Sequence, residues 1–176
     1  MNKSAVMFKN SLIKWLTKNG ISNLYVDYED DFSYAINDED ANIRCINIGV
    51  EKVEETGNIF EQFLYEYGCI YSDIPIPVLC FLHEAGHHMT ISNFSTIDLL
   101  LCDFLKKRIK DEDDFNFYYK YWLVDDEFEA NMWMINFINN NIEAVEDLCV
   151  LFSQGWNKIC SEINPFDLVK EDYYAA

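Results

Sequence analysis

All three histidines of the chain lie at the end of one stretch, Ile76-Pro77-Val78-Leu79-Cys80-Phe81-Leu82-His83-Glu84-Ala85-Gly86-His87-His88. On a helix, His83 and His87 are one turn apart and share a face. Both rings can then bind a single Zn²⁺ at roughly 2.0–2.1 Å from each nitrogen. Glu84 is offset around the helix, so its carboxylate can accept a proton from a water at the metal instead of binding the metal. The spacing therefore predicts a zinc site, with His83 and His87 as ligands and Glu84 as the general base.

The residues before this motif predict a buried helix over about residues 76–89. Residues 78–82 are all apolar. Pro75 and Pro77 stand where the start of a helix tolerates proline, and Ser72 or Asp73 could cap it. A chance match to so short a pattern is the alternative. The apolar setting, and the lack of any other histidine in the chain, favour a metal site.

The size and composition of the chain suit a single domain over residues 1–176. Half of the residues are hydrophobic and 16% are aromatic, which argues against disorder. The formal net charge of −18 repels phosphate backbones and anionic membranes, so neither nucleic acid nor a membrane is an expected partner. The same charge would attract a basic protein.

The six cysteines are expected to be free thiols. None belongs to a Cys-x-x-Cys pair, and most stand among apolar residues, where a thiol behaves as a small hydrophobe. The sequence contains no signal-peptide core and no segment long enough to span a bilayer. These features predict a reduced, cytoplasmic protein. A catalytic cysteine is disfavoured, because the histidines are committed to the metal.

Periodicity predicts an α+β fold with a small three-stranded sheet and further C-terminal helices. A helix over residues 4–19 is expected to end at Gly20. Three strands, at least partly antiparallel, are predicted at residues 24–28, 32–36 and 42–48. Later helices are predicted at residues 58–67, 76–89, 95–109, 117–139 and 142–160, with Ser95 and Asp98 as a capping pair for the third of these. The acidic residues 111–114 predict a solvated turn, since their spacing is not that of a calcium loop.

Two histidines do not complete a catalytic zinc site, which usually has three protein ligands and a water. With no further histidine, the third ligand must be a carboxylate or a cysteine, and residues 125–131 are the best candidates. Glu127 shares a helix face with Asn131, whereas Glu129 lies on nearly the opposite side. We therefore favour Glu127 over Glu129 as the third ligand. Asn131 is expected to hydrogen-bond the far ring nitrogen of a ligand histidine.

The neighbours of these residues have simpler expected roles. Ala130 shares the face of Glu127 and is small enough to let this helix pack closely on the motif helix. Asp125 and Asp126 are expected on a solvated face, which is the usual place for an acidic cluster.

Two motifs now stand together: His83-Glu84-Ala85-Gly86-His87, and Glu127-Phe128-Glu129-Ala130-Asn131 followed by the aromatic Trp133. The pair resembles the gluzincin metallopeptidases and, more narrowly, is similar to the ImmA/IrrE family. The resemblance implies a zincin-like fold, in which a small sheet and further helices surround a zinc-binding helix pair. It also implies a Zn²⁺-dependent peptidase. Several members of that family cut a helix-turn-helix repressor, often on mobile elements or in stress responses.

The chain departs from that family after the second motif. Residues 133–138 replace the usual Phe-Ala and Leu-Leu-Met-Pro continuation, a change that affects the expected substrate cleft more than the metal site. No DNA-binding segment accompanies the two motifs, so a repressor substrate would be a separate chain.

The sequence thus predicts a zinc-dependent endopeptidase acting on a protein such as a helix-turn-helix repressor. Two alternatives stay open: a non-catalytic interaction or regulatory protein stabilised by its metal, and a zinc hydrolase of a non-peptide substrate. An intact Glu84 favours an enzyme, because a structural site does not need it. A substrate strand is expected to pair with the sheet edge near residues 45–48. The donor to the developing oxyanion is left open among His88, Tyr118, Tyr119 and Tyr121.

Overall fold

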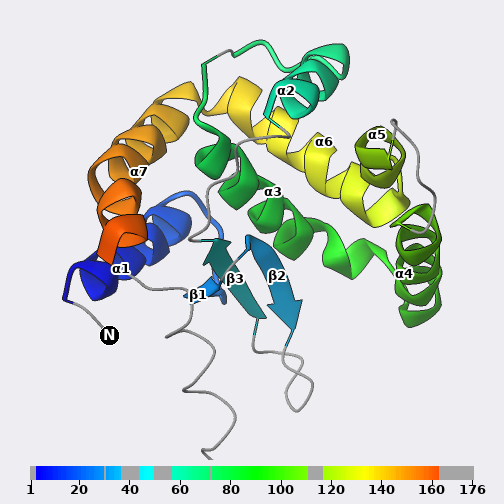
Figure 1. The fold of residues 1–176 in the computed structure, drawn as a ribbon, viewed down its shortest axis with the longest axis horizontal. Coiled ribbons are helices and arrows are strands. Elements are labelled where there is room, and N and C mark those ends of the chain that lie inside the picture. The colour runs from blue at the N-terminus through cyan, green and yellow to red at the C-terminus, as the bar shows by residue number, and fades with distance from the viewer. Residues whose placement is uncertain are drawn as a thin grey trace, which may run out of the picture.

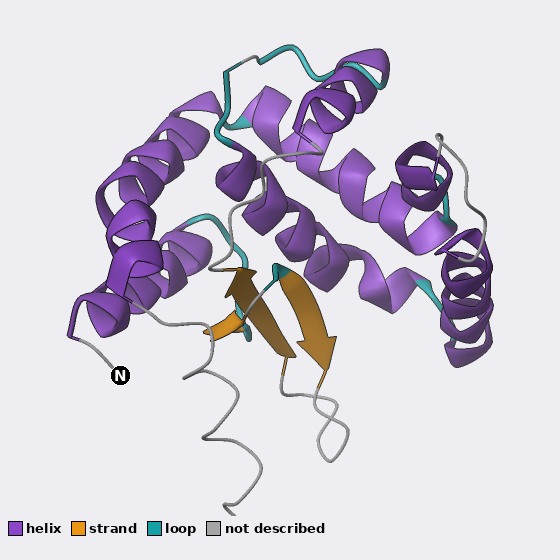
Figure 2. Ribbon diagram, viewed as in Figure 1, coloured by secondary structure: helices purple, strands orange, loops and turns teal. Residues whose placement is uncertain are grey.

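The computed structural model describes residues 3–29, 31–36, 44–49, 57–71, 73–110 and 117–162. These residues form seven α-helices, one 3₁₀ helix and one mixed three-stranded sheet, an α+β arrangement (Figures 1 and 2). In chain order the elements are α1 (Lys3–Lys18), β1 (Tyr25–Glu29), β2 (Ser33–Ile36), β3 (Arg44–Gly49), α2 (Gly57–Glu66), α3 (Ile76–Thr90), η1 (Ile91–Asn93), α4 (Thr96–Lys110), α5 (Phe117–Trp122), α6 (Asp125–Asn140) and α7 (Ile142–Glu162).

The sheet has the strand order β1-β3-β2. β3 pairs in parallel with β1, where Val26 lies opposite Ile46, and antiparallel with β2, where Tyr34 lies opposite the same Ile46. The predicted three strands, at least partly antiparallel, are therefore confirmed. The prediction that a substrate pairs with β3 near residues 45–48 is wrong, because β3 is the central strand and both of its edges are occupied. The strands with a free edge in the described sheet are β1 and β2.

α3 lies at the centre of the molecule, between the sheet and α6 (Figure 1). The apolar segment expected to bury this helix does so, since Val78, Phe81 and Leu82 have no exposed surface. α3 begins after Pro75 without a side-chain cap, so the prediction of a cap by Asp73 is wrong. Ser72, the other candidate cap, lies outside the described residues.

The contact between α3 and α6 depends on two small residues. A Cβ atom on Gly86 would overlap the carbonyl oxygen of Ala130 and would lie 3.0 Å from its Cα atom. Only glycine therefore fits at this point, and Ala130 itself has no exposed surface. The expected role of Ala130 in close packing is confirmed. This close approach brings the side chains of the two helices to one place.

The prediction of one long helix over residues 117–139 is wrong. α5 ends at Trp122, and α6 begins at Asp125 after Val124, whose backbone is extended (φ −66°, ψ 136°). The side chains of Trp122 and Val124 are both buried, and a break between the helices lets both reach the interior. The break also places Asp125 and Glu127 in the first turn of α6, where the helix dipole favours negative charge.

Several helix ends follow the sequence signals. Asp98 Oδ2 accepts hydrogen bonds from the backbone N–H and the hydroxyl of Ser95 (2.8 and 2.6 Å), which confirms the capping pair of α4. Gly20, at φ +79°, follows α1 in the left-handed region that glycine adopts without strain. The acidic residues 111–114 lie outside the described residues.

The cysteines whose side chains the structure describes are free, as expected: Cys45, Cys69, Cys80, Cys102 and Cys149. Within the described part of the chain, none of the helices combines the length and the apolar character that crossing a membrane requires.

Candidate metal centre

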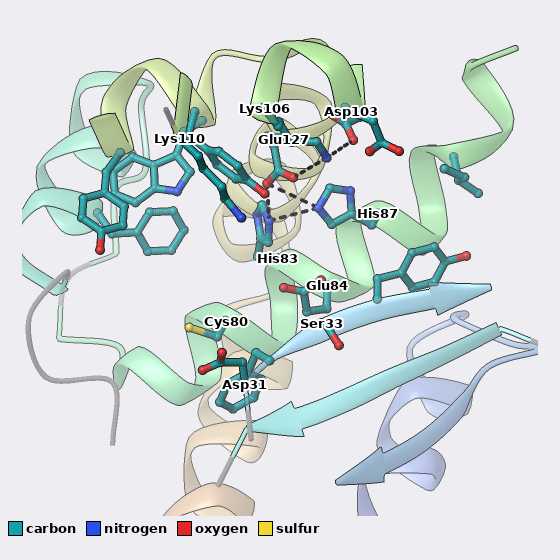
Figure 3. Close-up of a pocket in the computed structure, with 18 of the residues that line it drawn as sticks. Asp31, Ser33, Cys80, His83, Glu84, His87, Asp103, Lys106, Lys110 and Glu127 are labelled. Carbon is teal, nitrogen blue, oxygen red and sulfur yellow. Dashed lines mark hydrogen bonds and ion pairs between the residues drawn. The ribbon is translucent and has the colours of Figure 1, made fainter. Parts of the chain in front are cut away.

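Three potential ligands meet where α3 contacts α6 (Figure 3). His83 and His87 stand one turn apart on α3, and their Nε2 atoms lie 3.1 Å from each other. Glu127, in the first turn of α6, directs its Oε2 atom at both rings, 3.1 Å from His83 Nε2 and 3.5 Å from His87 Nε2. The structure thus brings together the three residues that the sequence predicts as ligands.

The triangle of donor atoms fits a zinc ion. With ligand bonds of about 2.0–2.1 Å and tetrahedral angles, two zinc ligands lie about 3.3 Å apart. The three separations here, 3.1, 3.1 and 3.5 Å, fall on either side of that value. Two imidazole nitrogens and one carboxylate oxygen are also a donor set that catalytic zinc sites use.

Glu84 provides a second carboxylate at the same place. It is buried, and one of its oxygens lies within 4.8 Å of a ring nitrogen of His83 and of His87. By distance alone, Glu84 could belong to the ligand set. Of the two carboxylates, Glu127 is the one in direct hydrogen-bond contact with a histidine, its Oε2 atom lying 3.1 Å from His83 Nε2.

Asn131 orients one of the two imidazoles. The Nδ1–H of His83 donates to Asn131 Oδ1 at 2.8 Å, and Asn131 has no exposed surface. Because a carbonyl oxygen can only accept, this bond keeps the proton on Nδ1 and turns Nε2 toward the site. The hydrogen bond expected from the shared face of Glu127 and Asn131 is present.

The charges of the site are strongly coupled. Burial alone would lower the pKa of His83, but the hydrogen bond with Glu127 and the negative charge of Glu84 outweigh it and raise the pKa to about 9. Burial would raise the pKa of Glu127, whereas its hydrogen bonds to the two histidines hold that pKa well below its usual range. Burial raises the pKa of Glu84, opposed by the charges of the same histidines. A metal ion binds deprotonated ligands, so its binding here would release protons.

The site forms one wall of a cavity of about 840 Å³. Besides the metal-site residues, this cavity is lined by β2, by one face of α4 and by an aromatic group. This aromatic cluster consists of Phe60, Phe117, Tyr118, Tyr121 and Trp122, and two further aromatic residues, Phe32 and Tyr34, also line the cavity. A space of this size admits a peptide side chain together with its backbone.

The four candidate oxyanion donors separate into two groups. Tyr118 and Tyr121 line the cavity. His88 instead turns away, with its Nε2 atom 2.9 Å from the Ser22 carbonyl oxygen, and the hydroxyl of Tyr119 donates to Glu66. Burial, and then the charge of nearby Glu127, raise the pKa of Tyr121, so its hydroxyl keeps its proton and can donate it in a hydrogen bond.

Three residues of this site were not predicted from the sequence. The ring of Tyr34 on β2 stacks beside that of His87, with centroids 6.2 Å apart. Asp126 is buried, so the expected solvated face is wrong for Asp126, although Asp125 is exposed as expected. The partner that allows this burial is Lys106 of α4, whose Nζ lies 2.6 Å from Asp126 Oδ2. These contacts join elements distant in the chain, and no local spacing marks them.

No family model, characterised protein or solved structure matches this chain.

The two candidate third ligands can be separated by mutation. Glu127→Ala is expected to weaken zinc binding by more than about 100-fold, because the loss of even an outer-shell partner typically costs 10–100-fold. Glu129→Ala removes the same group from an exposed position two residues away and should leave the affinity unchanged. Competition with a chromophoric chelator measures both constants. The reverse order would move the ligand to Glu129.

Proposed function

We propose that this chain is a zinc-dependent peptidase with a zincin-like fold, similar to the ImmA/IrrE family. His83, His87 and Glu127 would hold the metal, and Glu84 would act as the general base. The observation that carries the proposal is the convergence of the three donor atoms on the wall of an open cavity, with a buried carboxylate beside them.

The cavity favours an enzyme over a structural metal site. Structural zinc sites are closed by four protein ligands, whereas catalytic sites have three and keep one position for water or substrate. His83, His87 and Glu127 all line the cavity, so the fourth position would open into it. Glu84 also lines it, where a purely structural site has no need for a further carboxylate.

Each residue then has a defined part in peptide hydrolysis. Zinc, when bound, polarises a carbonyl group and makes water more acidic at neutral pH. Glu84 accepts the proton of the attacking water and passes it to the leaving amine. Asn131 keeps His83 in one tautomer and orientation. Of the two tyrosines that line the cavity, Tyr121 is the better placed donor for the developing negative oxygen, because its ring lies beside Lys106 and is less exposed than that of Tyr118.

β2 offers a place for the substrate backbone. It is an edge strand of the described sheet, and Ser33, Tyr34 and Ile36 line the cavity beside the metal site. An extended peptide could add to this edge as a further strand, with main-chain hydrogen bonds that do not depend on its side chains. We therefore expect the substrate strand to pair with β2 instead of β3.

The expected substrate is a basic protein. A net charge of −18 attracts positively charged partners and repels acidic ones. A helix-turn-helix repressor, the substrate that the family resemblance suggests, carries a basic DNA-binding surface and fits this requirement. A cytoplasmic location would be consistent with such a substrate.

The proposal is tested by removing and restoring the metal. Wild-type protein, chelator-stripped protein and stripped protein reloaded with one equivalent of Zn²⁺ are each incubated with a peptide library made by digesting a cell lysate. Mass spectrometry then identifies newly formed termini. We expect cleavage with the first and third samples only, and the same pattern on a purified helix-turn-helix repressor. Zinc-loaded protein that cleaves nothing in the library would favour the non-catalytic or non-peptide alternatives.

A further inference from the structure

Lys106 connects α4 to the third ligand. Its Nζ atom lies 3.0 Å from Glu127 Oε1 and 2.6 Å from Asp126 Oδ2, and only 15% of its side chain is exposed. Figure 3 shows Lys106 on one side of Glu127 and the histidines on the other. The two oxygens of Glu127 therefore have different partners: Oε1 faces the ammonium group and Oε2 faces the imidazoles.

The rest of α4 gives little reason to bury a lysine. Cys102 is the only buried residue of this helix, and its outer face leaves Ile97, Leu100 and Phe104 more than half exposed. Taking an ammonium group out of water is costly, and a buried ion pair often adds little net stability. An apolar side chain in place of Lys106 would attach α4 to the rest of the protein equally well. The position of Lys106 is better explained by its effect on Glu127.

We propose that Lys106 is a positioning residue of the metal centre, which holds Glu127 Oε1 so that Oε2 alone faces His83 and His87. This inference rests on the proposed zinc site. A carboxylate ligand that is itself hydrogen-bonded loses less freedom when it binds a metal, which is why outer-shell partners contribute to affinity. Without Lys106, the Glu127 carboxylate would be free to rotate away from the geometry that the structure shows.

The positive charge of Lys106 also acts in the opposite direction, by weakening the binding of a metal cation. Lys106 repels a cation, so its removal could strengthen metal binding by Coulomb's law. Asp126 lies 2.6 Å from the same ammonium group and cancels most of that field. Because Lys106 and Asp126 together carry no net charge, the hydrogen bond from Lys106 to Glu127 has the larger effect on metal binding. Removing Lys106 and the charge of Asp126 together then isolates that effect, because the net charge of the protein stays the same.

The test compares two double variants of the full chain with equal changes in chemistry. Lys106→Met/Asp126→Asn removes the buried pair, and Lys107→Met/Asp125→Asn makes the same changes at the next position on α4 and the preceding position on α6, both exposed. Zinc dissociation constants are measured by chelator competition, and thermal unfolding of the stripped proteins is followed by circular dichroism. We expect the first variant to bind zinc about 10–100-fold more weakly than wild type. The second should bind like wild type, and Lys106→Arg, which keeps a charged donor, should retain most of the affinity.

The outcomes separate this inference from the proposed function. Wild-type protein that binds no zinc would defeat the proposed function itself. Equal affinity of wild type and both double variants, or tighter binding by the Lys106 variant, would overturn only the role of Lys106. A lower unfolding temperature with unchanged zinc affinity would likewise show a merely structural ion pair. Should the first variant fail to fold, Lys106→Gln, which keeps a neutral donor, takes its place in the same comparison and is expected to show a smaller loss of affinity.

Discussion

Protein carrying His83→Ala and His87→Ala together is expected to contain essentially no zinc, whereas the wild-type chain should contain about one Zn²⁺ per molecule. The two imidazoles would supply two of the three donor atoms of the proposed site, and their Nε2 atoms lie 3.1 Å apart. Of the three proposed ligands, Glu127 alone remains in the double variant, and carboxylates without the histidines are not expected to bind zinc tightly. Elemental analysis of protein purified without added chelator measures the content directly.

The third histidine provides the control for this experiment. His88 is the next residue on α3, but its ring faces the Ser22 carbonyl oxygen and lies outside the cavity lining. His88→Ala should therefore keep its zinc, although the loss of a buried contact could lower its stability. Near-stoichiometric zinc in the His83/His87 double variant, or loss of zinc from folded His88→Ala, would contradict the site as assigned.

The parts of this site that the sequence predicts are those set by the geometry of a single helix. His83 and His87 meet because residues four apart share a helix face, and Glu127 lies with Asn131 for the same reason. α3 and α6 pack along each other, with Gly86 close against Ala130, and this packing brings the two motifs together. Short-range rules were sufficient for these residues.

The errors arise where tertiary packing overrides a local pattern. The basic run at the end of α4 that contains Lys106 carries no sequence signal of a contact with Asp126 or Glu127. Only the fold brings Asp126 to Lys106, and there Asp126 is buried while 15% of the Lys106 side chain stays exposed. The helix break at Val124 is likewise invisible to periodicity, since the residues on both sides have helical patterns. Strand order is a further example: the parallel pairing of β1 with β3 puts β2 at the edge, and three short strands in sequence do not reveal that choice.

The role of Glu84 is tested by replacing it with glutamine. The Glu84→Gln variant should still bind zinc but should lose its peptidase activity. Glutamine has the same size and can still hydrogen-bond water, but it cannot accept a proton. A positioned general base typically contributes about 10²–10⁴-fold, so kcat should fall by that factor while substrate binding changes little. Because Glu127 makes the direct contact with the histidines, zinc content should stay near that of wild type.

The assay and the metal analysis must be made on the same preparation of Glu84→Gln, because Glu84 also lies within 4.8 Å of both histidine nitrogens. Glu129→Gln is the matched control, as it makes the same change at an exposed position and should leave kcat and zinc content unaltered. Full activity in zinc-loaded Glu84→Gln would rule out a general base at this position. Loss of zinc together with activity would instead show that Glu84 is a ligand or a determinant of the fold, and as a ligand it would close the site with four side chains at the junction of α3 and α6. A catalytic centre and a closed structural site therefore predict different zinc contents for the same variant, and this single substitution distinguishes between them.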